Sequence, residues 1–162
     1  MGAQVESRCA PGGPLNFDIT KILRILPHRA PFVLIDRVIE LEPRRSARAF
    51  KCVTYNEPYL PGHFPGSPIF PAALCLEAMA QLMCVLCYAS KAIDPSLQMF
   101  VFAGVDKAKF RHPVTPGDRM IIGVDVLQHR SNIWKCQGTA VVDDVLCAEA
   151  QLLGAIQDRD DV

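Results

Sequence analysis

The sequence has no excess of charge of either sign, since 17 Lys and Arg residues balance 17 Asp and Glu residues. A nucleic-acid-binding domain normally carries a basic excess or stripe, so this balance indicates no nucleic-acid partner. The start of the chain also lacks the apolar segment of a secretory signal, because residues 1–14 are polar and rich in Gly and Pro. We expect residues 1–15 to form a disordered tail.

Paired cysteine motifs are almost absent. The chain has seven cysteines, an odd number, and most of them lie in apolar runs, where a free Cys behaves as a small hydrophobic residue. The one C-x-x-C, from Cys84 to Cys87, lacks the second pair that a structural zinc site needs. It also lies inside an apolar helical run, whereas a thioredoxin-like site lies at a helix start. We therefore predict core packing, no metal site and a reducing, cytoplasmic setting.

A membrane span is not expected, because it requires about 20 consecutive apolar residues with few charges. The longest apolar run begins at Pro71, and Glu77 and Gln81 interrupt it near its start. A helix that is apolar on all sides is normally buried in a core. The chain has 162 residues, half of them apolar, which suits a single domain, placed here at residues 16–158.

The order of the predicted elements is one helix, two strands, a loop, a long helix and four strands. Ile19, Ile22 and Ile25 keep helical spacing, and Pro27 ends this first helix. The long helix begins at Pro71 and ends before Pro95. The strands are expected over residues 31–41, 46–55, 99–110, 120–128, 133–142 and 145–156, the last four as an antiparallel meander. An α+β fold in which a sheet curls around one buried helix fits this order.

Two residues in and after the loop have the right chemistry for acid–base catalysis. Residues 56–71 contain five prolines and two glycines, which excludes a regular element. His63 lies in this loop, and His is the usual general base near neutral pH, although a lone loop His is more often an exposed surface residue. Glu77 lies among apolar helix residues, where burial favours a protonated carboxyl. The alternative is that Glu77 and Gln81 form a narrow exposed stripe. If His63 and Glu77 do not meet within one chain, a symmetric dimer would join them.

A series of motifs runs through residues 17–156. The motifs are LPHRAPFVLIDRV at 26–38, NEP at 56–58, GHFPGSPIFP at 62–71, LEAMAQ at 76–81, VDKAKFR at 105–111 and PVTPGD at 113–118. In content and order they closely resemble the bacterial 3-hydroxyacyl-(acyl-carrier-protein) dehydratase family, called FabZ. The resemblance implies a hotdog fold, in which an antiparallel sheet wraps around a long central helix. It also implies dimers or trimers of dimers, with His63 of one copy facing Glu77 of the other.

The family's reaction gives each candidate residue an expected role. The resemblance implies removal of water from (3R)-3-hydroxyacyl-(acyl-carrier-protein), which gives the trans-2-enoyl thioester in fatty-acid biosynthesis without a metal or organic cofactor. His63 is the expected general base, and protonated Glu77 the expected acid for the departing hydroxyl. Backbone N–H groups of Ala72 and Ala73 are expected to stabilise the enolate oxygen. Four aromatic residues are candidates for the acyl tunnel, with plain core packing equally open: Phe64, Phe70, Phe100 and Phe102.

One position departs from the family pattern, since Ala72 stands where the family has Gly. The backbone N–H remains, but the pocket or the substrate choice can differ. The dehydratase–isomerase branch has Asp where this chain has Glu77, which favours dehydration alone. A dehydratase of a specialised polyketide or polyene pathway stays open. So does an inactive subunit that partners a paralogous hotdog chain, and a hotdog thioesterase fits less well because it lacks this loop signature.

The remaining charged and His residues receive weaker interpretations. His28, His112 and His129 are assigned no catalytic role. A basic face for an acidic carrier protein is one interpretation of several cations, and scattered surface charge is the stronger one. These cations are Arg44, Arg45, Lys107, Lys109, Arg111 and Arg119.

Overall fold

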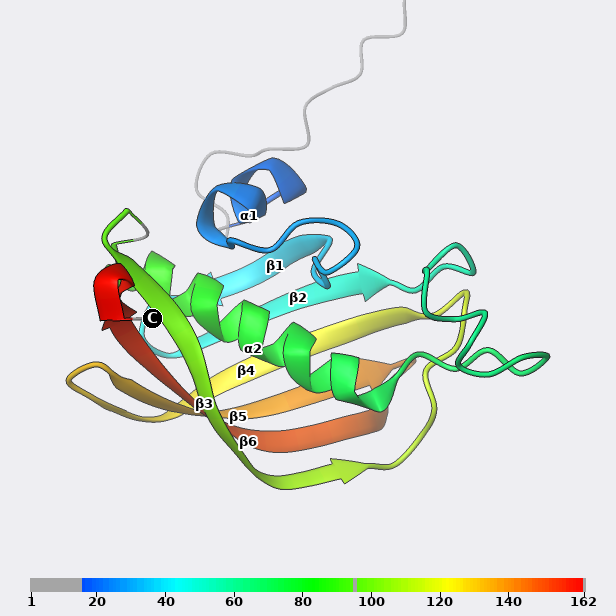
Figure 1. Ribbon diagram of the computed structural model, residues 1–162. Helices are drawn as coiled ribbons and strands as arrows, with labels where there is room; N and C mark the ends of the chain where they lie inside the picture. Colours follow the sequence, from blue (N-terminus) through cyan, green and yellow to red (C-terminus); the bar gives the residue numbers. More distant parts are fainter. Residues whose placement is uncertain (1–15, 95, 162) are drawn as a thin grey trace, which may run out of the picture.

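Six antiparallel strands form one sheet that wraps around a long helix in the computed structural model, which describes residues 16–94 and 96–161 (Figure 1). The predicted tail at residues 1–15 lies outside the described residues. In chain order the elements are α1 (Ile19–Ile25), β1 (Arg37–Glu42), β2 (Ser46–Cys52), α2 (Ala72–Ala89), β3 (Gln98–Phe110), β4 (Arg119–Arg130), β5 (Ile133–Val142), β6 (Val145–Asp158) and the short 3-10 helix η1 (Arg159–Asp161). The predicted α+β fold is confirmed.

The strands are ordered β1-β2-β4-β5-β6-β3 across the sheet. The predicted meander is correct for β4, β5 and β6, which are paired in sequence, but wrong for β3. β3 pairs with β6 at the far edge, and β4 pairs with β2 instead. Helix α2 lies between β2 and β3 in the chain and crosses the face of the sheet (Figure 1). The chain therefore reaches the far edge of the sheet before β3 begins.

The predicted strand at residues 31–41 is wrong in its first half, because β1 begins only at Arg37. Leu34 and Ile35 are fully buried, yet they lie in a loop. The backbone N–H of Leu34 donates to the side chain of Gln81 on α2 rather than to a neighbouring strand. The apolar run at residues 32–35 therefore reflects burial of a loop against α2. A continuous apolar run does not by itself distinguish such a buried loop from a buried strand.

Helix α2 is the core of the fold. Its residues from Ala78 to Cys87 are all buried. It is 18 residues long and apolar enough to cross a membrane by length and composition, but 61% of it is buried inside the fold, as in the core helix of a soluble protein. The prediction of a buried helix is confirmed, and the helix ends at Ala89, before the predicted Pro95.

Strand β3 is an edge strand whose helix-facing side is only partly covered. Phe102, Val105 and Phe110 pair with buried residues of β6 and so point to the same side of the sheet as those residues. Their side chains are nevertheless 37%, 39% and 52% exposed, respectively. One copy of the chain thus leaves an apolar surface at the edge of its own sheet.

Candidate active site

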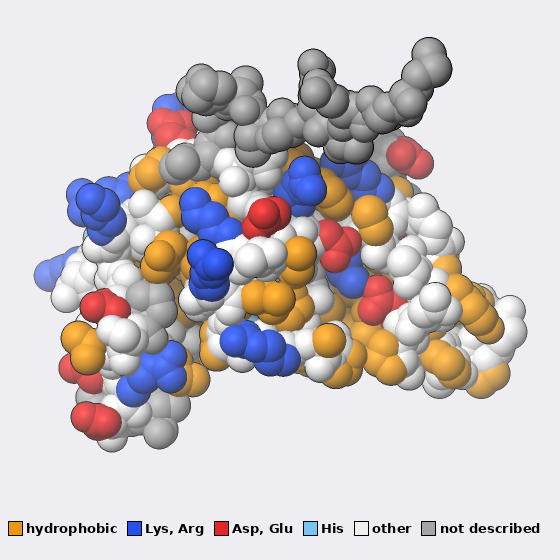
Figure 2. Space-filling view, turned by 90° about the horizontal axis from the view of Figure 1, so that it is seen from above, with side chains coloured by type: hydrophobic (Ala, Val, Ile, Leu, Met, Phe, Trp, Pro, Cys, Tyr) orange, Lys and Arg blue, Asp and Glu red, His pale blue; other side chains and the backbone are white. Residues whose placement is uncertain are grey.

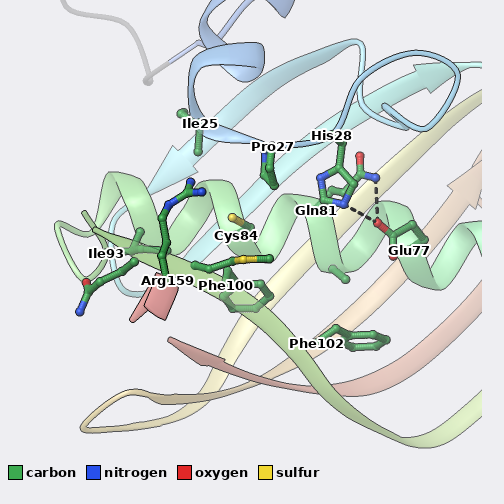
Figure 3. A pocket seen from close by; sticks show the side chains of 13 residues that line it. Ile25, Pro27, His28, Glu77, Gln81, Cys84, Ile93, Phe100, Phe102 and Arg159 are labelled. Carbon is green, nitrogen blue, oxygen red and sulfur yellow. Dashed lines mark hydrogen bonds and ion pairs between the residues drawn. The ribbon is translucent and has the colours of Figure 1, made fainter. Parts of the chain in front are cut away.

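The carboxyl group of Glu77 is held on one of its two oxygens (Figure 3). Glu77 lies in the first half of α2, and its side chain is 22% exposed. Oε1 accepts a hydrogen bond of 2.9 Å from Gln81 Nε2 and lies 3.3 Å from His28 Nε2. Among the described residues, Oε2 has no such partner. The second oxygen is therefore open to a bound molecule.

The amide of Gln81 is itself fixed by the backbone. Gln81 is 1% exposed, and its Oε1 accepts from the N–H of Leu34 at 2.9 Å. Its Nε2 donates to the carbonyl of Phe32 at 2.8 Å and to Glu77. A rotated amide would break the bonds to both backbone groups, and buried backbone groups are costly to leave unpaired. The loop before β1 thus determines where the Glu77 carboxyl points.

An apolar pocket extends from Glu77 between α2 and β3, with His28 and Gln81 beside the carboxyl (Figure 3). Its walls come from α1, α2, β3 and the loop before β3, and Arg159 lies at the end away from Glu77. The apolar lining includes Ile25, Pro27, Ala80, Cys84, Ile93, Met99, Phe100 and Phe102. A carboxyl group beside an apolar wall suits a ligand with a reactive head and a hydrocarbon tail.

His63 lies in the Pro-rich loop, 14 residues before Glu77 in the chain, and its imidazole has a defined orientation. Its Nδ1 is 2.8 Å from the carbonyl oxygen of Ile69. A carbonyl can only accept, so this contact assigns the proton to Nδ1 and leaves Nε2 of the neutral ring as a base. The ring stacks on Phe64 with a centroid separation of 4.2 Å.

A second pocket surrounds His63. It is lined by the loop, the start of α2, the end of β3 and the start of β6, and the lining includes Ile69, Phe70, Ala72, Cys75, Phe110, His112, Val114 and Cys147. None of its lining residues belongs to the pocket that holds Glu77. Within one chain, the predicted base and acid therefore lie in separate pockets.

The loop that carries His63 is anchored to β2 by a buried ion pair. Lys51 Nζ lies 2.6 Å from Glu57 Oε1, and the two side chains are only 6% and 12% exposed. The hydroxyl of Tyr59 donates to Glu57 Oε2 at 3.1 Å, and its ring packs edge-on against Phe70. Burial, and then the neighbouring Glu57 carboxylate, raise the pKa of Tyr59, so its hydroxyl remains a donor.

Three of the other predicted residues line the two pockets together with Ala72, whereas Phe64 and Ala73 line neither. Ala72 is the first residue of α2 and lines the His63 pocket, and no side chain caps the N-terminus of this helix. Phe100 and Phe102 line the Glu77 pocket, and Phe70 lines the His63 pocket with an exposure of only 1%. Phe64 is 52% exposed and lines neither pocket.

Sequence reasoning missed the contacts made by two His residues. His28, which was assigned no role, contacts Glu77, and His112 lines the His63 pocket. The first contact joins residues 49 positions apart, and no periodicity in the sequence indicates it. His129 makes only local contacts, with the Ser131 carbonyl and the ring of Trp134.

The cations that were considered as a basic face do not form one cluster in this chain. Arg44 and Arg45 lie in the turn between β1 and β2, whereas Lys107 and Lys109 lie in β3, at the opposite edge of the sheet. Basic and acidic side chains are interspersed on the face seen in Figure 2. Scattered surface charge is the interpretation that fits this arrangement.

The described cysteines are free thiols, and five of the six are buried. Burial raises the pKa of Cys75, Cys84 and Cys136 to about 12 each. Such thiols remain protonated at neutral pH and behave as core residues. Across residues 16–94 and 96–161, no group of three or more His, Cys, Asp or Glu side chains is arranged to hold a metal ion.

Comparison with known proteins identifies the family. The model of the FabA-like domain matches residues 26–151. A 3-hydroxyacyl-(acyl-carrier-protein) dehydratase FabZ of Sorangium cellulosum is 52% identical, with 91% of this chain and 95% of the relative covered. The FabZ of Myxococcus xanthus is 47% identical, with 88% and 94% covered, and that of Campylobacter concisus is 49% identical, with 88% and 99% covered.

Solved structures support the same fold at lower identity. The dehydratase heterocomplex ApeI:P from Xenorhabdus doucetiae matches with a TM-score of 0.70 and 20% identity, covering 86% of this chain and 92% of that chain. A mutant thioesterase from Pseudomonas aeruginosa matches with a TM-score of 0.64 and 14% identity, covering 87% and 94%. These two likenesses concern the hotdog fold alone. The family model and the relatives at 47–52% identity establish that this chain belongs to the FabA-like family and, within it, to the FabZ dehydratases.

Proposed function

We propose that this protein removes water from (3R)-3-hydroxyacyl-(acyl-carrier-protein) and releases the trans-2-enoyl thioester in fatty-acid biosynthesis. The observation that carries this proposal is the Glu77 carboxyl at the end of an apolar pocket, with one oxygen bound by Gln81 and close to His28 and the other without such a partner among the described residues. Relatives that are about half identical over nearly the whole chain are named for this reaction.

Each candidate side chain has one step in the reaction. Nε2 of His63 takes the proton from C2, which the neighbouring thioester carbonyl makes acidic, and the released electron pair forms the C2–C3 double bond. The C3–O bond breaks as Oε2 of Glu77 gives its proton to the hydroxyl, which leaves as water. The N–H groups of Ala72 and Ala73 would stabilise the negative charge on the carbonyl oxygen, a role supported by the absence of a side-chain cap at the N-terminus of α2.

A second copy of the chain would bring the two pockets together. β3 has the Glu77 pocket near its beginning, at Phe100 and Phe102, and the His63 pocket at its end, at Phe110. Two β3 strands paired antiparallel about a two-fold axis near Val105 would set Phe110 of one copy beside Phe100 of the other. The same pairing would cover the exposed apolar side of β3 and satisfy its free edge.

Higher assembly, carrier and location follow as parts of the same proposal. The homodimer is the smallest unit that completes the site, and a trimer of dimers would repeat it without changing the chemistry. A paralogous hotdog subunit would be needed only if two identical copies failed to form the site. The substrate arrives on an acyl carrier protein, and the free thiols of the described residues suit the reducing cytoplasm.

The test follows formation of the conjugated enoyl thioester from a 3-hydroxyacyl-(acyl-carrier-protein). Wild type should turn over, while His63→Ala and Glu77→Ala should each lose at least about a hundredfold in kcat. A mixture of the two inactive variants, after subunit exchange, should recover about a quarter of wild-type activity, because half of the dimers are mixed and each mixed dimer has one intact site.

The outcomes separate the parts of the proposal. A folded wild type that turns over neither short nor long substrates would contradict the assigned reaction. Activity that is lost in both variants and never returns on mixing, despite demonstrated exchange, would place both groups in one chain and contradict the shared site.

A further inference from the structure

The ring of Phe100 lies directly on the backbone of Gly154. A Cβ atom added at Gly154 would lie 2.2 Å from Cζ, 2.6 Å from Cε2 and 3.1 Å from Cε1 of this ring. Phe100 lies on β3 and Gly154 on the neighbouring strand β6, where Gly154 pairs with Phe102. The tip of the ring therefore occupies the space that any other residue at position 154 would fill.

The backbone conformation gives no separate reason for a glycine at this position. Among the described residues, only Gly66 and Gly117 are glycines with positive φ, the conformation that normally requires glycine. A glycine inside a strand otherwise weakens it, and it often marks a close approach by another group. The close approach at Gly154 is the Phe100 ring, so the two residues form a matched pair.

The position of the ring determines how much of the pocket is open. Phe100 lines the Glu77 pocket at the level of Cys84, well away from the carboxyl (Figure 3). Glu77 and Cys84 are seven residues apart on α2, a rise of roughly 10 Å along the helix axis. Because β6 lies behind the ring, a side chain at position 154 would push the ring forward, into the pocket. The constriction would be felt only by the distant part of an acyl chain.

We propose that the Phe100–Gly154 pair determines chain length, by holding the pocket open beyond the reacting carbons so that long acyl chains are accepted. This inference rests on the proposed dehydratase function, because that function places an acyl chain in the pocket. Short substrates end before they reach Phe100, so their turnover does not depend on the pair. The pair thus selects among substrates without taking part in the chemistry.

The experiment compares wild type with Gly154→Ala on 3-hydroxybutyryl-, 3-hydroxydecanoyl- and 3-hydroxyhexadecanoyl-(acyl-carrier-protein). We expect kcat/KM for the two longer substrates to fall by roughly tenfold or more, as for a methylene-sized misfit in a hydrophobic pocket, while the four-carbon substrate is unaffected. Gly104→Ala on β3 is the matched control, because its Cβ would meet nothing closer than 3.9 Å.

A double variant distinguishes constriction from misfolding. In Gly154→Ala/Phe100→Val the smaller side chain removes the clash, so kcat/KM for the long substrates should return towards the wild-type value. If Gly154→Ala slows all chain lengths equally, or none of them, the proposal is wrong. The proposal is also wrong if the double variant folds and turns over the four-carbon substrate, but has a kcat/KM for the long substrates as low as that of Gly154→Ala.

Binding provides a readout that does not depend on turnover. Saturated acyl-(acyl-carrier-protein) of the same three lengths has no hydroxyl to lose, and its affinity can be measured by calorimetry. Gly154→Ala should weaken the binding of the long acyl chains and leave the short one unchanged. If Gly154→Ala weakens the binding of long chains only, but wild type shows no turnover, the dehydratase function alone is contradicted. Equal affinities of wild type and variant for every chain length would contradict the chain-length role.

Discussion

The proposed proton-donating role of Glu77 depends on the buried amide of Gln81, one turn further along α2. Gln81 occupies one oxygen of the carboxyl and is locked by the backbone of Phe32 and Leu34. His28 approaches the same oxygen. Since both contacts are made to Oε1, Oε2 is the oxygen without such a partner among the described residues, and in the proposed reaction the proton on Oε2 is the one available to a substrate hydroxyl.

Replacement of Gln81 by Met keeps the size of the side chain and removes all three hydrogen bonds. We expect kcat to fall roughly tenfold or more, a part of the loss expected from removal of the acid itself, with KM little changed. The unfolding free energy should fall by about 2 kcal/mol, because the buried N–H of Leu34 loses its acceptor. Steady-state kinetics and urea unfolding measure the two effects.

Gln137→Met is the matched control, since the amide of Gln137, on β5, bonds to no described residue other than its neighbour Gly138, whose carbonyl accepts. This variant should change neither quantity appreciably. If Gln81→Met unfolded more easily but kept its kcat, Gln81 would be a structural residue only, and the orientation argument for Oε2 would be wrong.

At the scale of elements, the position of His63 depends on the way its loop is attached to β2. Lys51 at the end of β2 pairs with Glu57 in the loop, and Tyr59 completes the cluster. A buried ion pair adds little net stability over an apolar pair, but loss of one partner strands the other charge in the interior. Removal of either Lys51 or Glu57 is therefore expected to destabilise the attachment, because the other charge would remain buried without a partner.

Replacement of Lys51 by Met should lower the unfolding free energy by about 3 kcal/mol, because Glu57 is left buried without its cation. Turnover should fall as well, because the loop that holds His63 loses its anchor. The double variant Lys51→Met/Glu57→Gln should be more stable than the single variant, since no unpaired charge remains. Chemical denaturation of the three proteins measures this order.

An exposed ion pair provides the comparison. Arg45 and Glu42 pair in the β1–β2 turn, with side chains that are 76% and 57% exposed, and Arg45→Met should cost less than about 1 kcal/mol. Equal losses for the buried and the exposed pair would show that Lys51 does not anchor the loop.

The elements that sequence patterns predicted best are those whose pattern has a single explanation. The strand at residues 133–142 was predicted at both ends, and the helix after Pro71 at its start, although it ends at Ala89 rather than just before Pro95. The apolar run at residues 31–36 was wrongly predicted as strand, since a loop buried by α2 and a strand buried in a sheet both give a continuous run of apolar residues. The place of β3 beside β6 was also missed, because strand order depends on how α2 carries the chain across the sheet.

The candidate site was predictable only in part for a related reason. His63 and Glu77 stand out by residue type and by their motifs. The contact of His28 with Glu77 and the packing of Phe100 on Gly154 depend instead on segments that approach each other only in the folded chain. Neither contact has a periodic or compositional signal.

At the scale of the whole molecule, one chain keeps His63 and Glu77 in separate pockets, and its strand β3 lies at an edge of the sheet. Its two pockets lie towards opposite ends of β3, and the helix-facing side chains between them are incompletely covered. An edge strand with exposed apolar residues is a template for pairing with another chain. The proposed two-fold dimer would account for both the separation of His63 from Glu77 and the exposed side of β3.

Replacement of Val105 by Glu tests this arrangement at its centre. Val105 is 39% exposed in the single chain, so the substitution should leave the fold intact. In the proposed dimer it would bury two carboxylates near the two-fold axis, where like charges repel. We expect a folded monomer by sedimentation, with turnover reduced at least a hundredfold or so because no site is complete. Val145→Glu, in a residue 45% exposed at the start of β6, should keep both dimer and activity. A Val105→Glu variant that stayed dimeric and active would show that the copies meet elsewhere.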